Sequence, residues 1–123
     1  MALKHFNSDQ LDATISSGDL TLVYFWTDWH ERCAMSTPIM EELATKYEGK
    51  AHIVAINADA EGFLALELGA LSIPTVILFE NGEEIDRIAG VQPLELYASL
   101  LDVRLNPEEI NPYDIITSMG YMN

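Results

Sequence analysis

Apolar residues follow two kinds of spacing along the chain, one typical of strands and one typical of helices. Residues 20–26 are almost continuously apolar and rich in β-branched and aromatic side chains, which predicts a strand covered on both faces. Residues 51–56 and 76–79 show the same pattern. Over residues 33–47 the apolar positions instead recur every three or four residues, which predicts a helix with a kink at Pro38.

Turn and cap signals complete the order of the elements. Asn81-Gly82 is typical of a type I′ hairpin, which joins residues 76–79 to a further strand at residues 85–89. Three more helices are expected, at residues 8–18, 61–68 and 93–105. Helices that alternate with strands, followed by a hairpin, predict an α/β fold in which helices flank a mixed central β-sheet in a three-layer α/β/α arrangement.

Length and composition fit one domain. The chain has 123 residues, of which 49% are hydrophobic, and this is enough to fill a core of that size. No run of about eighteen apolar residues occurs, which excludes a transmembrane helix, and the N-terminus lacks the apolar core of a signal peptide. The single cysteine, Cys33, cannot form an internal disulfide. A reducing compartment suits such a chain, and we therefore expect a cytoplasmic protein.

The net charge limits the classes of partner. With 20 acidic and 6 basic residues, the chain carries a formal charge of −14. Binding to nucleic acid or to an anionic membrane needs a basic face, so neither is expected as a partner. The acidity favours solubility and partners that are basic.

Several residues stand in an order and at a spacing that resemble the thioredoxin family. They are Phe25-Trp26, Trp29, Cys33, Pro38, Asn57, Asp59, Ile73-Pro74-Thr75, Phe79, Asn81-Gly82 and Gly90. The resemblance implies a thioredoxin fold over residues 1–105, followed by a tail over residues 106–123 that could form a short helix. In the family the proline that matches Pro74 is cis and lies beside the active-site loop, and the same is expected here.

The active-site loop departs from the family's pattern. In the family this loop reads Trp-Cys-Gly-Pro-Cys, whereas residues 29–33 here read Trp-His-Glu-Arg-Cys. His30 replaces the nucleophilic first cysteine, and Cys33 occupies the position of the second, resolving cysteine. The family's buried Asp and Lys, which move protons for that thiol, fall at Tyr24 and Ala55. The resemblance therefore implies that conventional disulfide reductase activity, which needs two thiols, is absent.

A closer resemblance is to the thioredoxin-like domain of bacterial chaperedoxins, which lacks the first cysteine of the loop and keeps the last. The runs Tyr24-Phe25-Trp26 and Val91-Gln92-Pro93-Leu94-Glu95 are also similar to that group. Its members are holdase chaperones, which keep unfolding clients soluble, and they normally carry tetratricopeptide repeats after this domain.

Cys33 and His30 are the candidate catalytic residues. Cys33 is expected either to pack as an inert core thiol or to act as a monothiol, with external glutathione resolving its mixed disulfides. His30 precedes it by three residues and could modulate the ionisation of the thiol. The pair could also supply two metal ligands, but zinc takes about four and no other cysteine exists, so no metal and no cofactor are expected.

A docking surface is expected where the loop and the Ile73-Pro74 segment meet. Its candidate residues are Trp29, Arg32, Ile73, Pro74, Gly90 and Val91. Arg32 could pair with a carboxylate of glutathione or of a partner. Three functions are open: a protein-binding or holdase-type chaperone module for protein clients, a glutathione-dependent monothiol redox protein, and a structural subunit held in a larger complex by its tail. The apolar rim is also compatible with a dimer.

Overall fold

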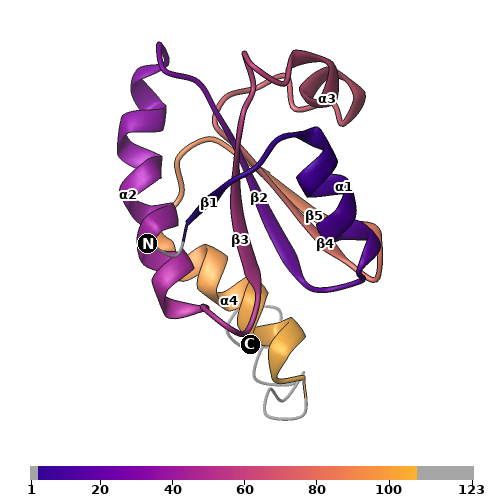
Figure 1. Cartoon of the computed structure of the whole chain (residues 1–123). Coiled ribbons are helices and arrows are strands. Elements are labelled where there is room, and N and C mark those ends of the chain that lie inside the picture. Colours follow the sequence, from indigo (N-terminus) through magenta and orange to yellow (C-terminus); the bar gives the residue numbers. More distant parts are fainter. Residues whose placement is uncertain (1–2, 108–123) are drawn as a thin grey trace, which may run out of the picture.

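Five strands and four helices alternate along residues 3–107, the part of the chain that the computed structural model describes (Figure 1). In chain order they are β1 (Lys4–His5), α1 (Ser8–Ser16), β2 (Thr21–Trp26), α2 (Glu31–Lys46), β3 (His52–Asn57), α3 (Gly62–Glu67), β4 (Thr75–Glu80), β5 (Glu83–Ala89) and α4 (Leu94–Leu105). The order predicted for the four helices and for strands β2 to β5 is confirmed, and β1 adds a two-residue strand before α1. The predicted helix in the tail, and all but the first two residues of that tail, lie outside the described residues.

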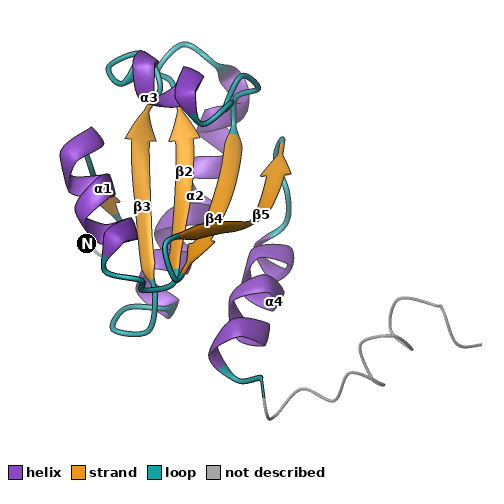
Figure 2. Ribbon diagram, turned by 90° about the vertical axis from the view of Figure 1, so that its right-hand side faces the viewer, coloured by secondary structure: helices purple, strands orange, loops and turns teal. Residues whose placement is uncertain are grey.

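The sheet is mixed, as the sequence predicts. Its strand order is β1-β3-β2-β4-β5, so that β2 lies at the centre. β1, β3 and β2 run parallel, while β4 is antiparallel to β2 and β5 is antiparallel to β4. Because β2 and β3 are parallel, their carboxyl ends meet at one edge of the sheet, and α3 and its flanking loops lie beyond that edge (Figure 2).

The side chains of β2 alternate between two cores. Leu22 and Tyr24 pack with side chains of α2 and α4, whereas Val23 and Phe25 pack with side chains of α1 and α3. All four are at most 1% exposed. Helices therefore cover both faces of the sheet in three layers, and this explains why the strand is apolar at every position. Within the described residues, none of the helices is long and apolar enough to cross a membrane.

The hairpin forms at Asn81-Gly82, as predicted. Both residues have positive φ, 56° and 81°, which a type I′ turn requires at its two central positions. β5 folds back along β4 after this turn, and the backbone N–H of Gly90 then donates to the carbonyl of Pro74 at 2.9 Å. The end of β5 is thereby joined to the loop that precedes β4.

Candidate functional site

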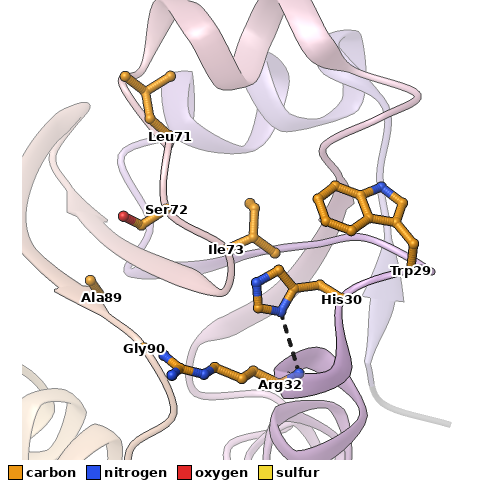
Figure 3. Close-up of a pocket in the computed structure, with 8 residues that line it drawn as sticks. All are labelled: Trp29, His30, Arg32, Leu71, Ser72, Ile73, Ala89 and Gly90. Carbon is orange, nitrogen blue, oxygen red and sulfur yellow. Dashed lines mark hydrogen bonds between the residues drawn. The ribbon is translucent and has the colours of Figure 1, made fainter.

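A groove lies between three segments of the chain: the β2–α2 loop, the loop between α3 and β4, and the end of β5 (Figure 3). It has a volume of about 520 Å³ and is lined by Trp29, His30, Arg32, Leu71, Ser72, Ile73, Ala89 and Gly90. The fold therefore brings the β2–α2 loop and the Ile73 segment together from distant parts of the sequence.

Four of the six residues predicted for a docking surface line this groove, namely Trp29, Arg32, Ile73 and Gly90. Pro74 does not, because it is buried behind the loop, and Val91 is not among the lining residues either. The peptide bond between Ile73 and Pro74 is cis, as expected.

Three lining residues were not predicted from the sequence: Leu71, Ser72 and Ala89. Leu71 is 75% exposed, which is unusual for a leucine and cannot be read from a loop without periodicity. These three residues could have been found from their neighbours in the sequence, since Leu71 and Ser72 directly precede Ile73 and Ala89 directly precedes Gly90.

His30 caps α2, and for this reason the helix begins at Glu31 rather than at the predicted residue 33. The backbone of His30 is extended, and its Nδ1 accepts a hydrogen bond from the backbone N–H of Arg32 at 3.3 Å. This N–H would otherwise lack a partner within the helix. A nitrogen that accepts a hydrogen bond carries no proton, so the neutral ring holds its proton on Nε2. The side chain in the place of the family's nucleophile thus serves as a helix cap.

Tyr24 links the central strand to the first turns of α2. Its hydroxyl lies 3.2 Å from the carbonyl oxygen of Cys33 and 2.9 Å from Oγ1 of Thr37, and this Oγ1 lies 2.9 Å from the same carbonyl, so that the two hydroxyl protons are shared among three contacts. Burial raises the pKa of Tyr24 to about 12, and the hydrogen bond with Thr37 opposes part of that rise. The phenol is therefore uncharged at neutral pH and fixes the helix by hydrogen bonding.

Ala55 pairs with Tyr24 in the register of β2 and β3, and it is 1% exposed. A large phenol and a small methyl group thus occupy the two positions where the family has its buried Asp and Lys. Neither side chain is charged at neutral pH. These two positions therefore lack the charged pair that moves protons for the resolving thiol in the family.

Cys33 does not line the groove. It is 3% exposed, and its Sγ accepts a weak hydrogen bond from the backbone N–H of Thr27 at 3.5 Å. The thiol instead adjoins a second, smaller hollow of about 290 Å³, and Trp29 and His30 line both hollows. Within residues 3–107, no third side chain joins His30 and Cys33 in a group that could hold a metal ion.

Trp29 forms the rim of the groove. Its Nε1 donates a hydrogen bond to Oδ2 of Asp59 at 2.6 Å, yet its side chain is 69% exposed. The hydrogen bond holds the indole in place without burying it. A large aromatic side chain that is both fixed and exposed is typical of an anchor in a protein interface.

Comparison with known proteins decides the family. The family model described as Thioredoxin matches residues 2–102, which is most of the chain. The chain belongs to the thioredoxin family. The thioredoxins of Staphylococcus haemolyticus (strain JCSC1435) and Staphylococcus aureus (strain Mu50) are 40% and 39% identical to it over 105 residues, which cover 85% of this chain and 100% of each relative.

Solved thioredoxin structures share the fold. A mutant thioredoxin from Halobacterium salinarum NRC-1 superposes with a TM-score of 0.76 and is 28% identical in sequence. The match covers 84% of this chain and 90% of the Halobacterium chain. The thioredoxin of Malassezia sympodialis gives 0.73 at 26% identity, with coverages of 80% and 87%. The predicted thioredoxin fold is thus confirmed, and this thioredoxin-family chain combines it with a single, buried cysteine.

We expect Cys33 in the folded protein to react with iodoacetamide at least about tenfold more slowly than in the urea-unfolded chain, because a buried thiol reacts only when the structure opens. Mass spectrometry of quenched time points at one mildly alkaline pH measures both rates. Equal rates in the two states would contradict the burial of the thiol.

Replacing Tyr24 by Phe should lower the free energy of unfolding by about 1 kcal/mol near neutral pH, because the Cys33 carbonyl loses one donor. The difference should shrink in alkali. The pKa of Tyr24 is raised in the folded state, so its stabilising effect is complete below the ordinary value of 10.0 and is lost as the pH rises towards about 12. Urea unfolding of both proteins across this range measures the difference, and a constant difference would contradict the shift.

Proposed function

We propose that this thioredoxin-family protein binds extended polypeptide segments non-covalently in the groove and acts as a protein-binding, holdase-type module. The observation that carries the proposal is the contrast between the groove and the thiol. Trp29 and Leu71, which are 69% and 75% exposed, line the groove, whereas Cys33 is 3% exposed and does not. A polypeptide in the groove would therefore meet apolar surface and no thiol.

Exposed apolar side chains support this proposal. Seven large apolar side chains are exposed among the described residues, and five of them lie on the early part of α2, on α3 or in the loops beside them: Trp29, Met35, Phe63, Leu66 and Leu71. Single exposed apolar residues are normal on a protein surface, but a concentration of them at one end of a molecule is typical of an interaction site.

The backbone of the groove supports an extended ligand. Within the described residues, neither the N–H nor the C=O of Ile73 has a hydrogen-bond partner, although Ile73 lines the groove just before β4. A backbone with free donors and acceptors can pair with a polypeptide in the manner of an added strand. Main-chain pairing gives affinity that depends little on the ligand's sequence, which suits a module for varied clients.

The chemistry of the loop also favours binding over exchange. The relatives are named thioredoxin, and the family's dithiol exchange needs an attacking and a resolving thiol, whereas this chain has Cys33 alone. The retained last cysteine and the missing first one resemble the thioredoxin-like domain of chaperedoxins, whose members are holdases. A lone thiol suits the reducing cytoplasm, where we place the protein.

We expect Trp29→Ala and Leu71→Ala each to weaken polypeptide binding by about tenfold, because each removes an exposed apolar anchor. The probe is a fluorescein-labelled peptide of about ten residues, with two adjacent leucines at its centre, lysines near both ends and no cysteine. Fluorescence anisotropy measures its affinity. Leu96→Ala, which removes an exposed leucine of α4 outside the groove, is the matched control and should bind like the unmodified protein.

Cys33→Ser separates the proposed function from monothiol chemistry. Non-covalent binding predicts that this variant keeps the affinity for the peptide within about twofold, since the thiol does not line the groove. Loss of binding in Cys33→Ser, or unchanged binding in both groove variants, would contradict the proposal. The same proteins can be compared in a light-scattering assay of an aggregating client, where the order of the variants should be the same.

A further inference from the structure

Among the arginines in the described residues, Arg32 alone has a guanidinium that makes no ion pair. Arg87 pairs with Glu84 at 2.8 Å, and Arg104 pairs with Glu80 at 2.7 Å. The guanidinium of Arg32 makes neither an ion pair nor a hydrogen bond with the described residues, and only the backbone N–H of Arg32 donates to a side chain, that of His30. Arg32 is thus the described arginine whose guanidinium is free to bind a ligand, although the chain has 20 acidic residues.

The side chain of Arg32 extends along the groove towards Gly90 (Figure 3). It leaves the first turn of α2 and crosses the space between the active-site loop and the end of β5. The arginine is exposed, so its five N–H donors are available to a ligand in the groove. The planar guanidinium matches a carboxylate in geometry and binds it through two parallel hydrogen bonds.

The groove is free of acidic side chains, although the protein as a whole is strongly acidic. None of its eight lining residues is Asp or Glu. Two further donors accompany Arg32. The neutral ring of His30 carries its proton on Nε2, because Nδ1 accepts the cap hydrogen bond, and Ser72 supplies a hydroxyl. A carboxylate in this groove therefore meets these donors and no acidic lining residue, while the nearby carboxylate of Asp59 accepts the hydrogen bond from Nε1 of Trp29 at the rim.

Building on the proposed function, we infer that Arg32 makes the groove selective for extended segments in which an Asp or Glu side chain adjoins large apolar residues. The apolar residues would pack on Trp29 and Leu71, and the carboxylate would pair with the guanidinium. An acidic side chain within a segment suits this arrangement, because Arg32 lines the same groove as Ile73, whose free N–H and C=O can pair with the main chain of that segment.

The test compares two peptides that differ in one residue. Both follow the design of the leucine peptide above, are acetylated and amidated, and carry either Glu or Gln directly after the two leucines. We expect the unmodified protein to bind the Glu peptide at least about fivefold more tightly than the Gln peptide. In Arg32→Gln the affinities for the Glu and Gln peptides should differ by no more than about twofold, while the affinity for the Gln peptide itself changes little. Arg32→Lys keeps the charge without the planar fork and should retain part of the preference.

Arg104→Gln is the matched control. It removes the same charge from an arginine of α4 that lies outside the groove, and it should leave the preference for the Glu peptide unchanged. An equal loss of preference in Arg104→Gln and Arg32→Gln would show an effect of net charge and overturn the inference. Equal binding of the two peptides by the unmodified protein would also overturn it, with the proposed function intact. Failure to bind either peptide would instead contradict the proposed function itself, and the inference with it.

Discussion

The geometry of the site depends on the hydrogen bonding of the Tyr24 hydroxyl to the start of α2. This hydroxyl reaches from the central strand to the carbonyl of Cys33 and the hydroxyl of Thr37, and so it fixes the first turns of α2 over the sheet. Because the phenol is fully buried, leaving its hydroxyl unpaired would cost on the order of 1–3 kcal/mol. The backbone positions of His30, which caps this helix, and of Arg32, in its first turn, follow from the position of this turn. One wall of the groove is therefore set by a hydrogen bond formed in the core.

The same contact shows how the protein keeps the fold without a charged pair in the core at Tyr24 and Ala55. A buried carboxylate needs a partner for its charge, and in the family a buried lysine lies nearby. Tyr24 and Ala55 replace both charges together, which avoids the cost of leaving one of them unpaired in the core. His30 then occupies the position of the nucleophile and contributes a cap for α2 in its place. Tyr24, Ala55 and His30 thus stand where the resemblance places the family's proton-transfer pair and its nucleophile, and the groove with its exposed rim lies beside His30.

Much of the fold follows from sequence patterns, whereas the site follows only in part. The continuous apolar run at β2 and the turn residues Asn81-Gly82 have one structural solution each, and both predictions are confirmed. The start of α2 was misplaced by two residues because histidine is not among the common N-cap residues. The exposure of Leu71 could not be predicted, since it depends on how the loop between α3 and β4 packs. The direction of Arg32 could not be predicted either, because a long side chain on a helix surface has many rotamers.

Two length scales of electrostatics would act on the polypeptide segment that we propose as the ligand. The net charge of −14 acts over roughly one Debye length, about 8 Å at physiological salt, and favours the approach of segments that are basic overall. Contact inside the groove is decided by the groups that line it, and these include one guanidinium and no carboxylate. The two effects favour opposite charges at different positions of one segment, so they do not compete. Under the proposal, a segment with an apolar and acidic centre between basic flanks would satisfy both effects, whereas a uniformly basic or uniformly acidic segment would satisfy only one.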